Sequence, residues 1–286
     1  MTAQDQDDEV LVPIANAILK SAGGLSKLSS EVGELLRESF DGAIKTPKTG
    51  RRLYDELEKT EKTYIGTCVE IELRHRLGFS RGKVLDYEIA GLEVDLKFSV
   101  GTSWMIPPEA FGRPCIIFSA DEKKARCCFG LFIAKSGYLN AGNRDQKCSI
   151  NKLGRESIRW LLKDEPYPPN FWQSVPEDVA DMIASARSGN KRIITLFREV
   201  MDQPISRKVI EDVAAQKDPM RRVRSDKTRG TRNQLAKDSI ILLCGDWSEA
   251  QQFINKVGLP PLGRSEFMSH RVVGDEVTLA KDLDLL

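Results

Sequence analysis

The clearest alternation of hydrophobic and polar residues in the chain runs from Val84 to Ser99. It predicts a β-hairpin with its turn at Ala90-Gly91, because strand-forming residues lie on both sides and glycine tolerates the positive φ of a tight turn. In this register Asp86 lies opposite Asp95, and since side chains alternate between the faces of a strand, opposed residues share a face. The polar face holds Asp86, Glu88, Glu93, Asp95 and Lys97. The hydrophobic face, which we expect to meet the core, holds Tyr87, Ile89, Leu92, Val94 and Leu96.

Helical spacing of hydrophobic residues predicts helices before the hairpin. They cover Val10–Ala22, Leu25–Phe40 and about Thr60–Leu77. The last of them carries Glu70 near the edge of its hydrophobic face, where a carboxylate is costly unless a charged group meets it. Because this helix directly precedes the hairpin, we expect it to pack there and to bring Glu70 to Asp86 and Asp95. An ordinary surface glutamate is the alternative interpretation of Glu70.

Further strands and then a helix are expected after the hairpin. The strands are at Pro114–Ala120 and Ala125–Ala134, and an amphipathic helix is at Leu153–Lys163. The two strands extend the sheet of the hairpin. The proline-rich segment Glu165–Asn170 breaks regular structure. We therefore place a domain boundary there, which divides the chain into residues 1–168 and 169–286.

The second domain is predicted to be a compact helical unit. Helices are expected at Lys191–Met201, Arg207–Gln216 and Asp218–Arg224, followed by a turn at Arg229–Gln234 and a strand at Ser239–Cys244. Ser206 and Asp218 suit the N-caps of two of these helices, and Pro219 suits a first helical position. Helices, a turn and a strand in this order favour a winged helix-turn-helix domain.

Composition narrows the classes of function. The 286 residues, of which 41% are hydrophobic and 30% charged, carry a net charge of +1 and are typical of a soluble globular protein. No run of 18 hydrophobic residues predicts a membrane span, and the acidic N-terminus is unlike a secretory signal. The six cysteines lack metal-ligand spacing and fit a reducing cytoplasm. With two histidines and no G-x-x-x-x-G-K-[ST] motif, a histidine-based site and a bound nucleotide are disfavoured, so carboxylates and lysine must carry any chemistry.

The polar face of the hairpin predicts a metal site. Opposed carboxylates repel each other by up to about 1 kcal/mol on an exposed face. Mg²⁺ removes this conflict, because it binds through one or two carboxylates together with substrate phosphate oxygens. Lys97 would aim an ammonium group at the same place, so Asp86, Asp95 and Lys97 together suit hydrolysis of a phosphodiester. The alternative is a solvated face with an Asp–Lys pair, because D-x-K is a short motif.

Two segments predict contacts with DNA. The loop between Gly137 and Lys147 is rich in side chains that pair with bases, since Arg fits guanine and Asn fits adenine. Its candidate residues are Asn140, Asn143, Arg144, Asp145 and Lys147. From Lys217 to Lys237 basic residues outnumber acidic ones, as expected of a surface that binds the phosphate backbone. The candidates there are Arg221, Arg222, Arg224, Arg229 and Arg232. A solvated surface is the alternative for both segments.

Several segments resemble the NaeI-type restriction endonucleases. They are Glu61–Ile71, Leu85-Asp86-Tyr87, Val94–Ser99, Trp104–Ala110, Leu139–Asp145, Asp218–Arg224 and Val257–Pro261. Together they are far more specific than D-x-K alone. The resemblance implies a PD-(D/E)-x-K nuclease domain, which is an α/β fold with a mixed sheet flanked by helices, followed by a mostly helical winged-helix DNA-binding domain. Leu85 stands where the motif has proline, which shapes the strand without binding the metal.

The resemblance also implies an activity and roles for individual residues. It implies a Mg²⁺-dependent type II endonuclease of the prokaryotic cytoplasm, acting as a homodimer on palindromic duplex DNA and stimulated by a second DNA copy. The implied catalytic residues are Glu70, Asp86, Asp95 and Lys97, and the implied metal ligands are Asp86, Asp95, Glu70 and the carbonyl of Leu96. Lys97 would orient the attacking water. A repair endonuclease that nicks one strand, and a winged-helix regulator with an inactive nuclease core, are the alternatives.

Overall fold

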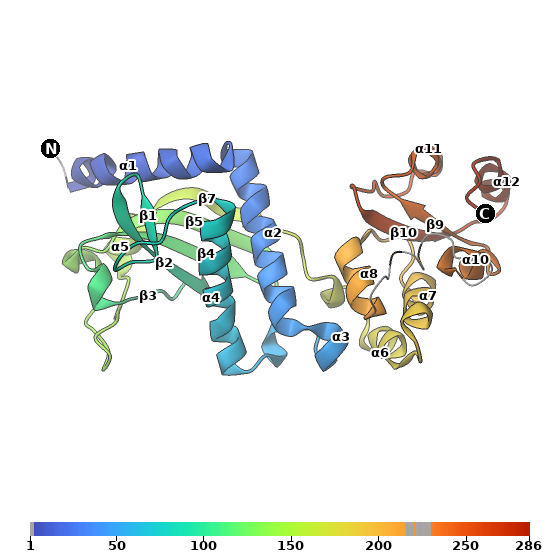
Figure 1. Ribbon diagram of the computed structural model, residues 1–286, viewed down its shortest axis with the longest axis horizontal. Coiled ribbons are helices and arrows are strands. Elements are labelled where there is room, and N and C mark those ends of the chain that lie inside the picture. Colours follow the sequence, from blue (N-terminus) through green and yellow to red (C-terminus); the bar gives the residue numbers. More distant parts are fainter. Residues whose placement is uncertain (1–2, 216–219, 221–222, 224–229) are drawn as a thin grey trace. The chain divides into compact units, whose positions relative to one another are not determined.

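The chain folds into two compact units, which Figure 1 shows as a computed structural model. The structure describes residues 3–215, 220, 223 and 230–286. The first unit consists of Met1–Ile44 and Tyr54–Asn170, and the second of Lys45–Leu53 and Phe171–Leu286. No described helix is both long enough and apolar enough to cross a membrane.

A five-stranded mixed sheet forms the centre of the first unit. Its strands are β1 (Tyr87–Ile89), β2 (Leu92–Val100), β4 (Pro114–Asp121), β5 (Arg126–Ile133) and β7 (Arg159–Pro166). They lie in the order β1-β2-β4-β5-β7, with β2 and β4 parallel and the other neighbours antiparallel. A separate two-stranded ribbon joins β3 (Met105–Ile106) to β6 (Cys148–Ser149). The sheet and its flanking helices confirm the predicted mixed α/β fold.

The hairpin has the predicted register. Tyr87 pairs with Val94, and Glu88 with Glu93. Ala90 and Gly91 both have positive φ angles, of 54° and 76°, as a two-residue turn between twisted strands requires.

Three helices cover one face of this sheet. They are α1 (Ala3–Ala22), α2 (Leu25–Ile44) and α4 (Lys59–Arg76), and Figure 1 shows them in blue to teal beside the strands. Helix α4 packs on α2 and on β2. Alternate residues of β4, Ile116 and Phe118, join the helices in one core, whereas Cys115 and Ile117 face a smaller core that contains Trp104. The two faces of the sheet are therefore distinct, which decides where the residues of β2 point.

The predicted helix at Leu153–Lys163 is wrong. The structure has a short helix α5 (Lys152–Glu156), capped by the side chain of Asn151, and then strand β7. Strand β7 completes the sheet by pairing with β5, with Leu162 opposite Phe129. Pairing along the edge of a sheet outweighs the weak local preference for helix, because the pairing satisfies backbone groups and buries the aromatic and aliphatic side chains of the segment.

The second unit combines small helices with a three-stranded antiparallel sheet. Its elements are α3 (Thr46–Thr49), η4 (Phe171–Gln173), α6 (Glu177–Ser185), α7 (Gly189–Glu199), β8 (Ile205–Ser206), α8 (Arg207–Ala214), α10 (Thr231–Ala236), β9 (Ile240–Cys244), α11 (Ser248–Val257), β10 (Glu266–Arg271) and α12 (Asp275–Asp282). Strand β10 lies between β8 and β9. Helix α3 packs here on α8, and Arg52 forms an ion pair with Asp181 at 2.9 Å.

The predictions for this unit have different outcomes. Ser206 caps α8, because its hydroxyl accepts a hydrogen bond from the amide of Val209, as predicted. The expected turn at Arg229–Gln234 is wrong for its described part, where α10 begins at Thr231. The predicted helix at Asp218–Arg224, with its cap Asp218, lies outside the described residues apart from Met220 and Val223, which are buried in the core of this unit.

Candidate active site

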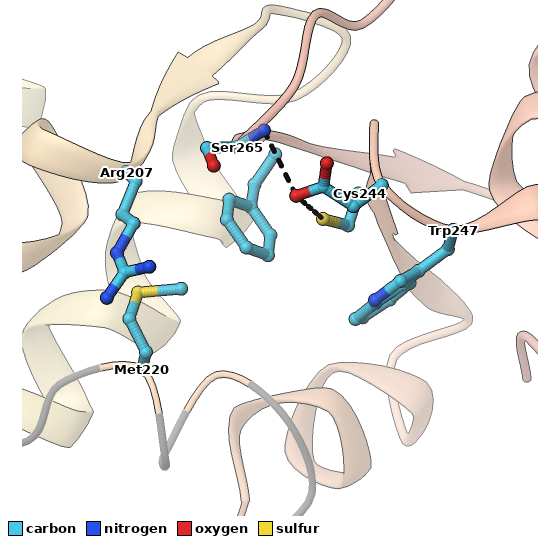
Figure 2. Close-up of a pocket in the computed structure, with 7 residues that line it drawn as sticks. Arg207, Met220, Cys244, Trp247 and Ser265 are labelled. Atoms are coloured by element: carbon cyan, nitrogen blue, oxygen red, sulfur yellow. Dashed lines mark hydrogen bonds between the residues drawn. The ribbon is translucent and has the colours of Figure 1, made fainter.

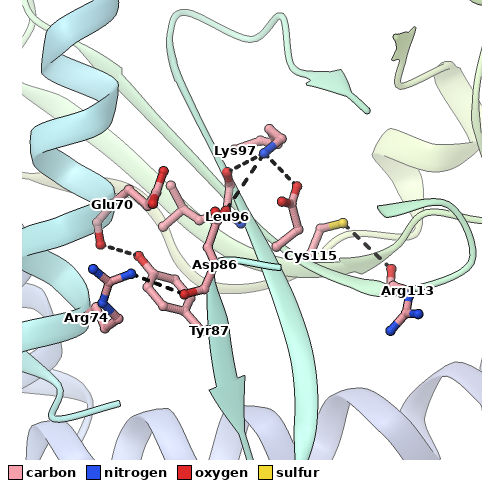
Figure 3. Close-up of polar contacts among 9 residues, drawn as sticks. Glu70, Arg74, Asp86, Tyr87, Leu96, Lys97, Arg113 and Cys115 are labelled. Carbon is pink, nitrogen blue, oxygen red and sulfur yellow. Dashed lines mark hydrogen bonds and ion pairs between the residues drawn. The ribbon is translucent and has the colours of Figure 1, made fainter. Parts of the chain in front are cut away.

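Strand β2 carries the central pair of the site. Asp95 and Lys97 pair across the parallel ladder with Cys115 and Ile117 of β4, and so point to the face of the sheet opposite the helices. Asp95 is 3% exposed. The Nζ of Lys97 lies 2.7 Å from Asp95 Oδ2 and donates a hydrogen bond of 2.9 Å to the carbonyl of Leu96 (Figure 3). The two side chains thus form a largely buried ion pair.

Asp86 reaches the same place from the segment that leads into β1. Its Oδ2 accepts a hydrogen bond of 2.7 Å from the amide of Leu96 and lies 3.9 Å from Lys97 Nζ. The ammonium group of Lys97 is therefore within ion-pair distance of both carboxylates, as Figure 3 shows. The structure brings together Asp86, Asp95 and Lys97, the three residues that the hairpin register placed on one face.

Burial and charge set the protonation of this cluster. Burial raises the pKa of Asp95 to about 7, although the nearby ammonium of Lys97 opposes the shift. Burial alone would lower the pKa of Lys97, but the charges of Asp95 and Asp86 outweigh it and leave the Lys97 pKa raised. Lys97 is therefore a cation. Its charge only partly offsets the cost of burying the ionised carboxylate of Asp95.

Glu70 occupies a different position from the other acids. It lies on α4, which packs on the hydrophobic face of the hairpin, and Figure 3 shows it beside Leu96 and Asp86. Partial burial raises the pKa of Glu70, and the negative charge of Asp86 raises it further. Glu70 thus lies near Asp86 but arrives from the helix-covered side of the sheet, whereas Asp95 faces the other side.

The donor atoms of the cluster suit a hard divalent cation. The carboxylates of Asp86 and Asp95 and the carbonyl of Leu96 are all oxygen donors, which Mg²⁺ prefers over the nitrogen and sulfur donors of zinc sites. Nowhere in the described residues do three or more His, Cys, Asp or Glu side chains lie close enough together to hold a metal ion. Two carboxylates and one carbonyl would leave the remaining ligand positions of such a cation to water and substrate phosphate.

Glu93 was placed on the acidic face by the sequence, but it has another partner. Its Oε1 accepts a hydrogen bond of 2.7 Å from the amide of Val84, and its Oε2 lies 3.3 Å from the guanidinium of Arg113. Backbone bonds from this segment hold the pKa of Glu93 below its ordinary value. Glu93 therefore closes the loop that leads to Asp86.

The predicted base-contacting loop is ordered by its own side chains. Asn143 Oδ1 accepts hydrogen bonds from the amides of Asp145 and Lys147, at 2.9 and 3.0 Å. Asn140 donates a bond of 2.9 Å to the hydroxyl of Ser149. The side chain of Arg144 is 97% exposed. Asn143 thus shapes the loop, and Arg144 extends from it into solvent.

Most of the basic residues predicted to bind DNA in the second unit lie outside the described residues. They are Arg221, Arg222, Arg224 and Arg229. The guanidinium of Arg232, on α10, donates to the carbonyl of Asp284 and lies 5.7 Å from the ring centroid of Trp247. Arg232 is therefore engaged within its own unit.

The second unit also contains a cavity of about 180 Å³. Its lining, drawn in Figure 2, is Arg207, Met220, Cys244, Asp246, Trp247, Ser265 and Phe267. Within it, Asp246 Oδ2 accepts a hydrogen bond of 3.2 Å from the amide of Ser265. The cavity shares no residue with the cluster of Asp86, Asp95 and Lys97.

Two further polar residues support the cluster and were not found from the sequence. The hydroxyl of Tyr87 donates to the carbonyl of Glu70 at 2.7 Å, and Arg74 Nη1 donates to the carbonyl of Asp86 at 3.3 Å. The alternation of the hairpin identified Tyr87 as a core residue, which it is, but carried no signal for the partner of its hydroxyl. Arg74 lies one helical turn after Glu70, and that spacing is the signal that was available.

A mixed sheet flanked by helices, with two carboxylates and a lysine meeting beside one hairpin, is the arrangement of a restriction-endonuclease-like nuclease domain. The comparisons agree. The family model described as restriction endonuclease NaeI matches residues 25–280. The type II restriction enzyme NaeI of Lentzea aerocolonigenes is 37% identical over 247 residues, which cover 84% of this chain and 77% of that protein. The chain belongs to the NaeI restriction endonuclease family, and this confirms both the family and the enzyme class, a site-specific deoxyribonuclease, that its motifs predicted.

Proposed function

We propose that the protein is a Mg²⁺-dependent type II restriction endonuclease that cuts both strands of duplex DNA at a palindromic site. The observation that carries the proposal is the position of Lys97 Nζ, 2.7 Å from Asp95 and 3.9 Å from Asp86. The two carboxylates can hold a metal ion that also binds the scissile phosphate. The ammonium group between them can then stabilise negative charge on that phosphate. Family membership supports the choice of DNA as the substrate.

Each residue of the site has a proposed role in phosphodiester hydrolysis. Asp86, Asp95 and the carbonyl of Leu96 would hold the cation, and Glu70 would assist directly or through a water molecule. When bound, Mg²⁺ would supply polarisation of the phosphate oxygens. Lys97 orients the attacking water and stabilises the negative charge that develops on the phosphate. Its raised pKa keeps Lys97 protonated for that role.

We propose different roles for the two domains predicted at residues 1–168 and 169–286. The first would be the endonuclease domain and the second a winged-helix domain that binds effector DNA. The chain order α7, β8, α8, α10, β9 and β10, with β10 between β8 and β9, supports a winged helix.

We also propose a homodimer that binds two DNA copies. A palindromic site has two-fold symmetry, and a two-fold dimer presents one nuclease domain to each strand. The basic stretch from Lys217 to Lys237 supplies phosphate-binding charge for the second copy. The same symmetry argument favours double-strand cleavage over nicking.

Plasmid cleavage by site variants tests the catalytic proposal. Asp95→Ala and Lys97→Ala should abolish cleavage in Mg²⁺ and leave DNA binding intact, while Lys123→Ala, at an exposed turn that pairs with Asp55, should cut as the wild type does. If the protein cleaves DNA equally well in EDTA and in Mg²⁺, the proposed dependence on a metal ion is wrong. Accumulation of nicked circles without linear product would favour the repair-type alternative.

A short duplex with a single recognition site tests the effector proposal. Adding cognate DNA that cannot be cut should accelerate cleavage of this duplex, and Arg221→Ala together with Arg224→Ala should remove the acceleration without removing basal cleavage. If the rate does not depend on added cognate DNA, the two-copy proposal is wrong, and the single-site nuclease remains.

A further inference from the structure

Two hydrogen bonds link α4 to the segment that carries Asp86, and they are reciprocal. Tyr87, the neighbour of Asp86, donates its hydroxyl to the main-chain carbonyl of Glu70 at 2.7 Å. Arg74, one turn along the helix from Glu70, donates to the main-chain carbonyl of Asp86 at 3.3 Å. The backbone carbonyl of Glu70 is thus held by Tyr87, next to Asp86, and the backbone carbonyl of Asp86 is held by Arg74, on the helix of Glu70. The dashed lines in Figure 3 show both bonds.

The Tyr87 bond is more than the packing of an aromatic ring. Tyr87 is 1% exposed, so its hydroxyl would lack a partner if the bond to Glu70 were broken. The carbonyl of Glu70 lies inside α4, where it already serves the helix, and it uses its second lone pair for Tyr87.

Glu70 and Asp86 repel each other. Both side chains are carboxylates, and Figure 3 shows Glu70 beside Asp86, so their like charges oppose each other. Nothing in this repulsion favours a close approach of α4 to Asp86 in the absence of a cation. The two bonds fix the backbones of both acids before any cation binds, which is how outer residues commonly orient metal ligands.

We propose that Tyr87 and Arg74 are positioning residues that hold Glu70 beside Asp86, so that acids from a helix and a hairpin can act on the same divalent cation. The inference rests on the proposed metal-dependent nuclease function. It predicts that Tyr87 and Arg74 control affinity for the metal, whereas Lys97 controls the chemical step.

The test measures metal binding without DNA. Mn²⁺ is titrated onto the full-length protein in a calorimeter, and the Mg²⁺ dependence of plasmid cleavage is measured in parallel. Tyr87→Phe, which keeps the ring and removes the hydroxyl, should weaken Mn²⁺ binding about tenfold, as losses of such outer bonds do. The Mg²⁺ concentration for half-maximal cleavage should rise by a similar factor, while kcat at saturating Mg²⁺ stays within about twofold.

A matched control separates positioning from stability. Tyr167 is also a buried tyrosine of the first unit, and its hydroxyl donates to Glu122 Oε2 at 2.6 Å. Tyr167→Phe should lower stability as Tyr87→Phe does, with no change in Mn²⁺ affinity. Arg74→Met removes the second bond from a less buried position, and should shift Mn²⁺ affinity in the same direction as Tyr87→Phe.

Each outcome decides a different point. If wild-type protein neither binds Mn²⁺ nor cuts DNA in Mg²⁺, the proposed function itself is wrong. If wild type does both, but Tyr87→Phe and Arg74→Met match it in Mn²⁺ affinity and in Mg²⁺ dependence, the positioning inference is overturned. Should Tyr87→Phe fail to fold, Arg74→Met alone decides between these results.

Discussion

Replacing Asp95 by asparagine should stabilise the metal-free protein. Asp95 is 3% exposed, and burial raises its pKa to about 7 even though Lys97 lies 2.7 Å away. The folded protein therefore binds this proton more tightly than the unfolded chain, whose aspartates titrate near about 4. Stability consequently falls as the pH rises from about 4 to about 7 and stays reduced above that. A neutral asparagine avoids this loss.

The structure bounds the size of the effect. A rise from 3.8 to about 7 corresponds to roughly 4 kcal/mol, at about 1.4 kcal/mol per pKa unit. This figure is an upper limit, because relaxation and water penetration lower the cost of a buried charge in real proteins. We expect Asp95→Asn to gain about 1–3 kcal/mol at pH 8 and much less at pH 5. At about 2–4 °C per kcal/mol, the midpoint of thermal unfolding should rise by several degrees at pH 8.

Unfolding in urea and EDTA, followed by circular dichroism at both pH values, measures this gain. Asp145→Asn is the control, because Asp145 lies in an exposed loop with a side chain 65% exposed. Added Mg²⁺ should stabilise the wild type and not the Asp95 variant, since only the wild type keeps both carboxylates. The reasoning is refuted if Asp95→Asn is no more stable than wild type at pH 8. It is also refuted if the gain in stability at pH 5 equals the gain at pH 8, because a raised pKa of Asp95 predicts a smaller gain at pH 5.

Three other predictions follow from the first unit. Glu122→Gln should lower the free energy of unfolding by about 2–4 kcal/mol, measured in urea, because the buried carboxylate holds Arg37 at 3.0 Å and loses its charge. Gly82→Ala should reduce plasmid cleavage roughly tenfold or more, because the added Cβ would lie 2.5 Å from a carbonyl of the loop before Asp86. Gly42→Ala, which meets no atom within 4 Å, should cut normally. Arg144→Ala should leave stability unchanged within about 0.5 kcal/mol and weaken DNA binding, measured by fluorescence anisotropy at fixed salt, by about 1–3 kcal/mol. Unchanged binding would remove Arg144 from the DNA interface.

The hairpin was predictable because two local rules agree there. Alternation put Asp86, Asp95 and Lys97 on one face, and the turn at Ala90 and Gly91 fixed the register in which Tyr87 pairs with Val94 and Glu88 with Glu93. A one-residue slip would have turned every side chain to the other face, so the hydrophobic face permits a single register. The acids, the lysine and the turn were therefore available from a short stretch of sequence.

The segment after Leu153 was not predictable by the same means. Its hydrophobic spacing fits a helix, and a five-residue helix does form at its start. The remainder becomes β7 because β5 offers an unpaired edge, which is a property of the assembled sheet and not of the segment. The route by which Glu70 approaches Asp86 was equally hidden from local patterns, since it depends on how α4 packs against β2 in the assembled fold.

The backbone of Leu96 explains why side-chain patterns give an incomplete account of the site. Its side chain is buried in the core, as the alternation predicted. Its amide fixes Asp86 at 2.7 Å and its carbonyl fixes Lys97 at 2.9 Å. One peptide position therefore sets both the anionic and the cationic side of the cluster, and any hydrophobic residue that fits the core can supply the same two groups. The geometry of the site is held by strand β2 itself, so that changes of side chain at this position alter packing and leave the two anchoring bonds in place.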